Sequence, residues 1–321
     1  MARLAAIDCG TNSIRLLVAD VTTGDDGTSD GTAHLRDVHR EMRIVRLGEG
    51  VDATGRLGEA ALGRTRTALA DYTAICRRKG VERVRMVATS ATRDASNRDE
   101  FFAMTRAVLG VEAEVISGDE EARLSFTGAV GDLDPEDGPF VVTDIGGGST
   151  EVVVGGWDGK RADIIGARSV DIGCVRITER CLRSDPPTAD ETAAARELAA
   201  GVLGEAFAAV PVDKARTWVG VAGTITTLSA VAQGLGEYDA ERTHLSRLSD
   251  VDIDRTARRL LTATHDERAA IGAIHPGRVD VIGGGALITR VLAEKFAASA
   301  GIDELLVSEH DILDGIVLSL L

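Results

Sequence analysis

Short apolar stretches alternate with longer amphipathic stretches along most of this chain. The short ones are rich in Val, Ile, Leu and Ala and are bounded by glycine or polar residues, which is typical of strands. They predict strands at 3–9, 14–21, 33–47, 83–89, 112–117, 140–144, 151–155, 162–170, 217–222 and 279–283.

Apolar positions at helical spacing separate many of these strands. They predict helices over 56–79, 98–109, 119–130, 189–209, 224–234, 250–264, 286–299 and 309–320. Thr188 and Glu191 have the spacing of a capping box at one helix start, a purely structural feature. Strands that alternate with helices predict the α/β class.

Two polar, glycine-rich segments interrupt this pattern. The segment 22–32 (TTGDDGTSDGT) predicts an exposed hairpin tip, and 131–139 (GDLDPEDGP) predicts a domain boundary. We therefore expect one domain over 1–130 and a second over 131–307. A C-terminal helix at 308–321 is expected to pack back onto the first domain.

One short pattern occurs twice. Residues 5–18 read AAIDCGTNSIRLLV, and residues 140–154 read FVVTDIGGGSTEVVV. In each copy an apolar strand leads to Asp-x-Gly, then to small hydroxyl-bearing residues, and then to a second apolar strand. The aspartates are Asp8 and Asp144. The repetition predicts two similar halves with a cleft between them.

The residue types of this pattern suit a phosphate site. Glycine lets the backbone come close to a ligand, and free amides in such a turn point at an anion. An adjacent aspartate can hold a divalent cation through its oxygens. Two such turns facing each other would clamp a phosphate chain and its metal. The alternative is a pair of unrelated β-hairpins, but the matching order in both copies favours the phosphate site.

Composition and charge narrow the class of protein. The chain has 321 residues, of which 44% are hydrophobic and only 3% aromatic, enough for two cores built from aliphatic side chains. The net charge of −15 argues against nucleic-acid binding through a basic surface. A polyanionic substrate would therefore need a local positive field made by the site itself.

Several other features carry less chemistry. No apolar run approaches the ~20 residues that span a bilayer, and the chain begins with a predicted strand rather than a leader. We therefore expect a cytoplasmic protein without membrane contact. The four cysteines, which show no metal spacing, are expected to be reduced and structural. They are Cys9, Cys76, Cys174 and Cys181. The six histidines share no spacing and are interpreted as structural or exposed.

Charged residues follow two predicted strands. Arg93 can project from a strand end toward a cleft, where its planar fork suits a phosphoryl group, although it can equally be a surface arginine. The run Asp119-Glu120-Glu121 begins a helix, where acidic residues are often present only because they favour the helix dipole. A carboxylate there can also deprotonate water.

Two further glycine-containing segments are weaker signals. Gly223 and Thr224 follow a strand and begin a helix, whose amides can bind an anion. The segment 281–286 (VIGGGA) allows either the same role or tight packing of a strand against a helix.

Taken together, these segments resemble the exopolyphosphatase/guanosine pentaphosphate phosphohydrolase family. The resemblance runs from the first strand to the C-terminal helix, and the combination of strings is far more specific than any one of them. Many members carry additional C-terminal helical domains, so this chain resembles the short form. The matching strings are DCGTNSIRL at 8–16, RLGEGV at 46–51, TGRL at 54–57, ATSATRDA at 88–95, ISGDEEARL at 116–124, DIGGGSTE at 144–151 and AGT at 222–224.

The resemblance implies the duplicated, ribonuclease-H-like fold of actin, sugar kinases and chaperone ATPases. It implies that Glu121 is the general base and that Arg93 holds the terminal phosphoryl group, with Glu120 the rival base by sequence alone. Asp144 and Glu151 would bind Mg²⁺ or Mn²⁺, with Asp8 joining through water. The implied phosphate cradle comprises Gly10, Thr11, Asn12, Ser13, Gly146, Gly147, Gly148, Ser149, Gly223 and Thr224.

The expected activity is the removal of terminal orthophosphate from inorganic polyphosphate. Short chains are the expected substrate, because the acidic chain offers no long basic track. A close alternative is the hydrolysis of guanosine pentaphosphate (pppGpp) to tetraphosphate (ppGpp) at the same site. A small-molecule kinase and a non-catalytic sensor of (p)ppGpp or polyphosphate are less favoured, since no sugar pocket is recognisable and the catalytic strings are complete. A homodimer is implied by the resemblance alone.

Overall fold

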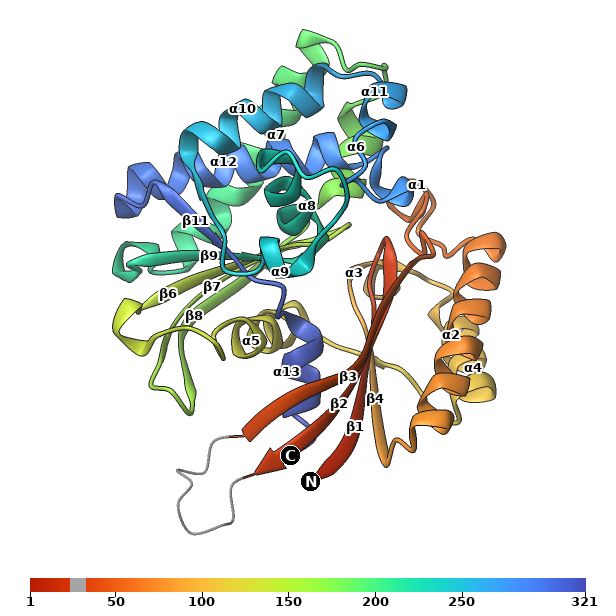
Figure 1. Cartoon of the computed structure of the whole chain (residues 1–321). Coiled ribbons are helices and arrows are strands. Elements are labelled where there is room, and N and C mark those ends of the chain that lie inside the picture. Colours follow the sequence, from red (N-terminus) through yellow and green to blue (C-terminus); the bar gives the residue numbers. More distant parts are fainter. Residues whose placement is uncertain (24–32) are drawn as a thin grey trace.

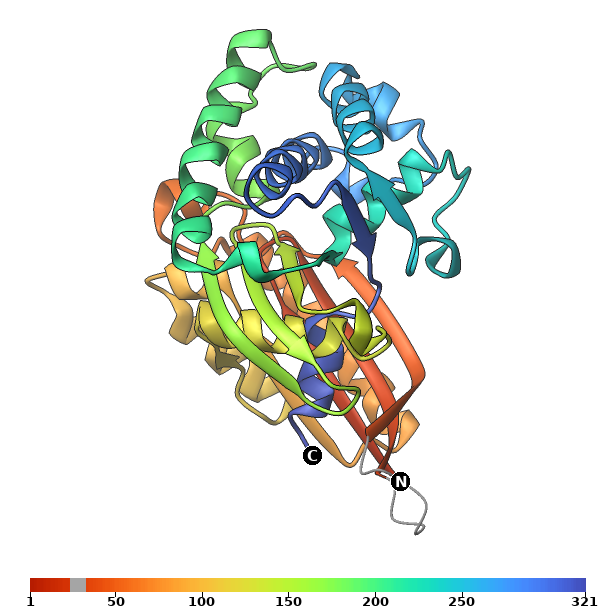
Figure 2. The same cartoon turned by 90° about the vertical axis from the view of Figure 1, so that its left-hand side faces the viewer.

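The computed structural model describes residues 1–23 and 33–321. Two β-sheets lie on either side of a pair of helices, and further helices cover the outer face of each sheet (Figures 1 and 2). The predicted α/β class is confirmed. The predicted tip at 22–32 lies almost entirely outside the described residues.

The first sheet is five-stranded, in the order β3-β2-β1-β4-β5. Helices α2 (Glu59–Lys79) and α4 (Arg98–Leu109) cover its outer face, and α13 (Ile312–Leu318) packs against β1 and β2 on the inner face. The strands are β1 (Ala2–Cys9), β2 (Ser13–Thr23), β3 (Ala33–Ile44), β4 (Arg83–Ala88) and β5 (Glu114–Val115).

Alternation along β1 determines where Asp8 points. Successive side chains of a strand point to opposite faces. Ala5 and Ile7 belong to the cluster under α2 and α4, whereas Leu4 and Ala6 belong to the cluster under α13. Asp8 continues the second series and therefore faces the inner helices.

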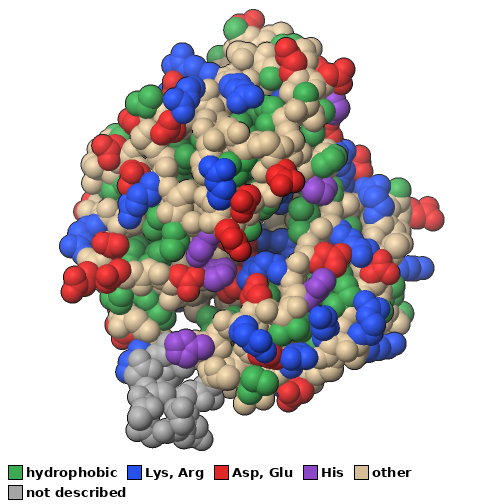
Figure 3. Space-filling view, viewed as in Figure 1, with side chains coloured by type: hydrophobic (Ala, Val, Ile, Leu, Met, Phe, Trp, Pro, Cys, Tyr) green, Lys and Arg blue, Asp and Glu red, His purple; other side chains and the backbone are tan. Residues whose placement is uncertain are grey.

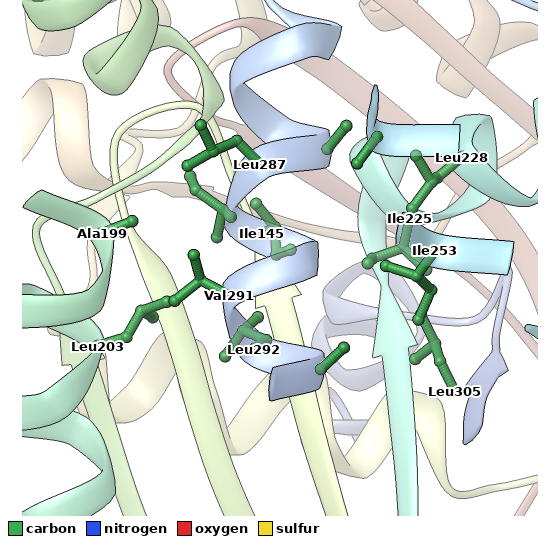
Figure 4. Close-up of a cluster of buried hydrophobic side chains, with 14 of the residues drawn as sticks. Ile145, Ala199, Leu203, Ile225, Leu228, Ile253, Leu287, Val291, Leu292 and Leu305 are labelled. Atoms are coloured by element: carbon green, nitrogen blue, oxygen red, sulfur yellow. The ribbon is translucent and has the colours of Figure 1, made fainter. Parts of the chain in front are cut away.

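The second sheet has six strands in the order β10-β11-β9-β6-β7-β8. Its outer face packs against α7 (Ala189–Ala209), α8 (Ala222–Ala232), α10 (Asp250–Thr262) and α12 (Ile282–Ala300). Figure 4 shows part of this aliphatic core, where Ile145 points toward Leu287 and Val291 of α12. The strands are β6 (Phe140–Ile145), β7 (Thr150–Trp157), β8 (Ala162–Val170), β9 (Thr217–Val221), β10 (Arg247–Ser249) and β11 (Glu304–Val307).

The inner face of this sheet packs against α5 (Gly118–Ala129). Phe140 and Val142 of β6 belong to this inner cluster, so Asp144 also faces inward and accepts a hydrogen bond from Ser125 of α5 at 2.7 Å. The same alternation thus brings the aspartates of both copies of the repeated pattern to the inner faces of their sheets.

Helices α5 and α13 cross at two glycines. A Cβ on Gly128 would lie 1.8 Å from the carbonyl oxygen of Asp311, and one on Gly315 would lie 2.0 Å from that of Leu124. Neither position has room for a side chain, so backbone packs directly on backbone. The crossing holds the inner helices of the two sheets together.

The structure corrects one predicted strand. Residues 279–283 form no strand: α12 begins at Ile282, after a 3₁₀ turn at Pro276–Arg278. The glycines at the start of α12 allow close packing against two other helices. A Cβ on Gly284 would lie 2.5 Å from Thr178, and one on Gly285 would lie 2.5 Å from Thr224. A short apolar run does not by itself distinguish a buried helix from a strand.

The other predicted strands and helices are confirmed with shifts at their ends, and the capping box of Thr188 is present. The pattern did not predict β10, β11 or the short helices α1 (Val51–Thr54), α3 (Ser90–Asp94), α6 (Cys174–Cys181), α9 (Ala240–Thr243) and α11 (His265–Ala269). All four cysteines are free, as expected. The predicted boundary at residue 130 stays a prediction.

Candidate active site

The two Asp-x-Gly segments form matching turns between paired antiparallel strands. The amide of Gly10 donates to the carbonyl of Ser13 at 2.9 Å, and the amide of Gly146 donates to that of Ser149 at 3.0 Å. Among the described residues, the amides between these positions, such as those of Asn12 and Gly147, have no partner. Both turns therefore offer backbone donors to an anion.

The two turns approach each other closely. A Cβ on Gly147 would lie 2.8 Å from the Cβ of Thr11, and one on Gly148 would lie 2.5 Å from the Oγ of Ser90. Glycine is required here because any side chain would push the turns apart. The loops thus face each other across a narrow cleft, as the repeated pattern predicted.

The cleft contains a cavity of about 80 Å³. A second cavity of about 590 Å³ adjoins it and shares Arg15, Ala222, Gly223 and Arg278 with it. The small cavity is lined by all ten predicted cradle residues and by Asp8, Glu121 and Asp144. Glu151 and Arg93 lie beside this cavity rather than in its lining, and both interact with Glu121.

The structure separates the two neighbouring glutamates at the start of α5. The Glu121 side chain is 10% exposed, lines the cleft and accepts a hydrogen bond from Arg93 Nη1 at 2.7 Å. The Glu120 side chain is 44% exposed and pairs with Arg85 at 2.6 Å. Arg93 lies on α3, a single helical turn after β4. Burial raises the pKa of Glu121 to about 7.

Asp144 and Glu151 are buried opposite each other across the β6–β7 hairpin. Each has a hydroxyl partner at 2.7 Å: Ser125 for Asp144 and Ser169 for Glu151. Burial raises the pKa of Asp144 to about 6. Burial, together with repulsion from Glu121 and Asp144, raises the pKa of Glu151 well above its ordinary value. This hairpin concentrates negative charge.

Asp8 has a cationic partner. Arg15, across the β1–β2 hairpin, donates to Asp8 Oδ2 through Nε and Nη2 at 3.0 and 2.8 Å, and through Nη1 to Asp311. Burial nevertheless raises the pKa of Asp8 above its ordinary value, against the attraction of Arg15.

Two buried carboxylate oxygens have no hydrogen-bond partner within the described residues: Asp8 Oδ1 and Glu151 Oε2. Unpartnered buried acceptors are costly and call for a missing group. A divalent cation with oxygen preference meets this need and offsets the repulsion among the carboxylates. The residues present therefore fit the Mg²⁺ or Mn²⁺ expected from the sequence.

Sequence reasoning gave no role to three residues of the site. Arg15 forms ion pairs with both Asp8 and Asp311. Arg278 lines both cavities, and its guanidinium would be only 2.0 Å from a Cβ on Gly223. Burial lowers its pKa, and within the described residues it has no carboxylate partner, only Thr227 at 3.3 Å. Arg15 stood in a matching string, but no motif signals Arg278 in its 3₁₀ turn.

The β9–α8 junction completes the cleft. Ala222 has φ +69°, a left-handed conformation that is unusual for a residue with a side chain. Strain of this kind is often found at functional sites. The turn brings Gly223 and Thr224, at the first turn of α8, into the lining of the cavity.

Facing phosphate-type turns, buried carboxylates and local arginines between two α/β units define a class: a phosphate-handling enzyme with the duplicated fold of actin-like ATPases. The chain belongs to the Ppx/GppA phosphatase family, whose model matches residues 27–320. The resemblance found in the sequence is thereby confirmed.

Similar proteins agree with this assignment. The chain is 57% identical to exopolyphosphatase 2 of Mycobacterium tuberculosis, over all of this chain and 99% of that one. It is 30% identical to a guanosine-5'-triphosphate,3'-diphosphate pyrophosphatase of Photobacterium profundum, over 78% of this chain and half of that protein.

Solved structures support the fold. The crystal structure of an exopolyphosphatase-like protein superposes with a TM-score of 0.92 at 42% identity, covering 99% of this chain and 98% of that one. Nucleoside triphosphate hydrolases of Neospora caninum give a TM-score of 0.55 at 12% identity, over 99% and 93% of the chains, and show a shared fold only. Each helix within the described residues is too short or too polar to cross a bilayer.

Proposed function

We propose that this protein is an exopolyphosphatase that removes terminal orthophosphate from inorganic polyphosphate. The observation that carries the proposal is the buried Glu121–Arg93 pair at the edge of a cleft walled by two phosphate-type turns. The 57% identity to an exopolyphosphatase supports the same substrate. The partner of the protein is thus polyphosphate rather than nucleic acid or a membrane.

The two turns and the local arginines bind and orient the substrate. Phosphoryl transfer depends mainly on positioning and on neutralising charge. Backbone amides of the turns would hold the terminal phosphate, while Arg93 and Arg278 supply positive charge that the acidic surface lacks. Both hydrogen bonds of Arg93 within the described residues use Nη1. Its Nε and Nη2 groups are therefore left for a phosphoryl oxygen.

Glu121 is the proposed general base. A base works best when its pKa lies near the operating pH, and burial raises that of Glu121 to about 7. It would take a proton from water as the water attacks the terminal phosphorus. Glu120 is directed to Arg85 and does not line the cleft.

Asp144 and Glu151 are the proposed ligands of Mg²⁺ or Mn²⁺, with Asp8 contributing through water. Such an ion, when bound, would neutralise charge on phosphate oxygens. The unpartnered oxygens of Glu151 and Asp8 support this assignment. Full activity in excess EDTA would contradict it.

We further propose a preference for short chains. The adjoining cavity of about 590 Å³ gives room for several phosphates beside the terminal one. Arg43 and Arg46, two further arginines of the chain, pair with Asp71 and Asp280 and so add little free positive charge. Few phosphate contacts mean weak retention of a long chain. Gels of partly digested long polyphosphate should show gradual shortening of the whole population, not intact chains beside finished product.

Hydrolysis of pppGpp is the second candidate. The adjoining cavity also includes Tyr238, Met42 and Leu313, and aromatic and aliphatic side chains of this kind can pack against a nucleoside. The relation to the Photobacterium enzyme favours the same alternative. A cytoplasmic homodimer remains part of the proposal, to be checked by light scattering of the purified protein.

The decisive test is phosphate release from pure polyphosphate and from pppGpp, measured side by side. Glu121→Gln should lower turnover on the order of 10²- to 10⁴-fold while the protein still binds substrate. Glu120→Gln is the matched control, one residue away on the same helix, and should stay near full activity. An inactive Glu120→Gln with an active Glu121→Gln would reverse the assignment. Binding of either compound without any hydrolysis would identify a sensor instead.

A further inference from the structure

Two histidines and one aspartate meet outside the cleft, from three separate segments. Asp132 follows α5, His244 follows α9 (Ala240–Thr243), and His310 lies in the linker from β11 to α13. Figure 3 shows two histidine side chains next to each other on this face, near acidic ones. The sequence analysis interpreted all histidines as structural or exposed, because their spacing in the chain shows no pattern.

The three side chains direct one ligand atom each toward a common point. These atoms all lie within 4.8 Å of one another. Asp132 Oδ2 lies 2.6 Å from His310 Nδ1 and 3.4 Å from His244 Nε2. The imidazole rings lie 4.9 Å apart at an angle of 39°. Among the described residues, no other group of three or more His, Cys, Asp or Glu side chains brings its ligand atoms this close together.

Backbone hydrogen bonds fix the chain at and beside the two histidines. Leu245, directly after His244, has φ +57°, and its amide donates to the carbonyl of Val307 at 2.7 Å. The amide of His310 donates to Ser308 Oγ at 3.1 Å. A left-handed residue next to a potential ligand is an unusual local conformation, and such strain tends to be kept where it serves a site.

The ligand set has the chemistry of a transition-metal site. Two imidazoles and a carboxylate, with open positions for water, suit Zn²⁺ and related divalent ions, whereas Mg²⁺ prefers oxygen ligands alone. The side chains are partly exposed, at 25% for His244, 36% for His310 and 45% for Asp132, so an ion can enter from solvent.

Binding would require a change in protonation. His244 Nδ1 accepts a hydrogen bond from the Glu309 amide at 3.2 Å, which places the proton of the neutral ring on Nε2, facing Asp132. The hydrogen bond to Asp132 raises the pKa of His310 to about 9, so this ring is protonated at neutral pH. A metal ion must displace the His310 proton to solvent, and for the metal to bind His244 Nε2 the proton of that neutral ring must move to Nδ1. The long bond from Glu309 is given up in the process.

We propose that Asp132, His244 and His310 form a binding site for a divalent transition metal, with Zn²⁺ as the expected ion. The ion would clip together the end of α5 and the β11–α13 linker. That linker continues into Asp311, which pairs with Arg15 beside Asp8. The site would therefore stabilise the connection between the two sheets at a point that leads directly to the cleft.

The experiment is zinc titration of metal-free protein by calorimetry in two buffers of different ionisation enthalpy. Because the catalytic carboxylates also attract Zn²⁺, all proteins carry Asp144→Asn. This parent should bind one Zn²⁺ with release of protons and show an increase in melting temperature on zinc addition. His310→Ala and His244→Ala, each made in this background, should lose that event with at least a tenfold weaker affinity. His39→Ala is the matched control, a histidine of comparable exposure whose one ion pair within the described residues is with Glu41.

Co²⁺ supplies a second readout that does not depend on stability. With both histidines present, bound Co²⁺ should give visible d–d absorption of a site with nitrogen ligands, and either variant should lose it. If a variant is unfolded in circular dichroism, Asp132→Asn replaces it, since that side chain is the most exposed of the three. Equal zinc stoichiometry and equal spectra in parent and variants would overturn the proposal and leave a hydrogen-bonded His–Asp–His group only.

Discussion

The two hairpins that carry the repeated pattern differ in charge at one register position. In the β1–β2 hairpin Asp8 is paired with Arg15, and in the β6–β7 hairpin Asp144 is paired with Glu151. Both partners stand seven residues after their aspartate, in otherwise matching turns. The first hairpin therefore provides its own cation, and the second places two acids where the first has an acid and a base.

This difference assigns separate tasks to the two copies. A buried ion pair offsets its own charge within the protein, whereas two buried carboxylates repel each other and remain costly until a cation arrives. Glu151 has an oxygen with no hydrogen-bond partner in the described part of the chain, and its pKa is raised well above the ordinary value. The second hairpin is thus the one expected to hold the metal, at the expense of stability without it.

Among changes to the two hairpins, the largest effect on activity is expected from Glu151→Gln, which removes the acid that distinguishes the second hairpin. Phosphate release in Mg²⁺ should fall on the order of 10²-fold or more, since a bound metal contributes several kcal/mol to stabilising transition-state charge. In EDTA the variant should melt at a higher temperature than the parent, because a buried repulsion is gone. Asp163→Asn, on the neighbouring strand β8, is the exposed control. Unchanged turnover would mean that the metal sits elsewhere.

Arg15→Gln removes the cation that distinguishes the first hairpin. The free energy of unfolding should fall by about 3–5 kcal/mol, because Asp8 and Asp311 are left buried beside each other without their shared partner. Denaturant unfolding, followed by circular dichroism, measures this change. Arg36→Gln, which removes an exposed arginine from Asp20, should cost about 1 kcal/mol or less. Equal losses in the two variants would contradict the contrast between buried and exposed pairs.

The pH dependence of stability sharpens the comparison. In metal-free protein, burial raises the pKa of Asp144 from 3.8 to about 6, so the folded state binds a proton more tightly than the unfolded state does. The resulting contribution to the free energy of unfolding is fully present below about pH 4 and is lost as the pH rises through about 6, about 3 kcal/mol in total. The free energy of unfolding of the parent, measured relative to that of Asp144→Asn, should therefore be higher at pH 4 than at pH 7. A difference that does not vary with pH would exclude a raised pKa.

The smallest effect is expected from Ser125→Ala, which removes the hydroxyl that donates to Asp144 at 2.7 Å. Outer-shell partners of a metal ligand typically change affinity by about 10–100-fold, and a single neutral hydroxyl should fall at the low end of this range. Mg²⁺ titration of activity measures the shift. Ser169→Ala, which removes a hydroxyl of β8 at the same distance from Glu151, provides a parallel case for the second acid of this hairpin. An affinity unchanged in both variants would argue that neither hydroxyl orients a ligand.

The sequence predicted the parts of the site that depend on local order. The repeated Asp-x-Gly pattern and strand alternation are both local, so the facing turns were foreseeable. Which side of a helix faces the cleft was not foreseeable in this way. Glu120 and Glu121 are neighbours in the chain, but Glu120 pairs with Arg85 and Glu121 pairs with Arg93.

Features made by distant segments could not be predicted in this way. Arg278 reaches the cleft from a 3₁₀ turn in the same region where a strand was wrongly expected. The pairing of Arg15 with Asp311 joins residues almost 300 positions apart. Residues that meet only in three dimensions show no regular spacing in the chain, so no sequence pattern reveals their contact.

The glycine crossing of α5 and α13 has a mechanical consequence. Gly128 lies on the helix that carries Glu121 and Ser125, and it touches the backbone of Asp311, whose side chain holds Arg15. Contacts through long side chains would absorb small displacements, whereas backbone against backbone transmits them. The distance between the proposed base and the arginine-bearing hairpin is therefore held nearly constant. Even a methyl group at Gly128 would force the two helices apart and change that distance.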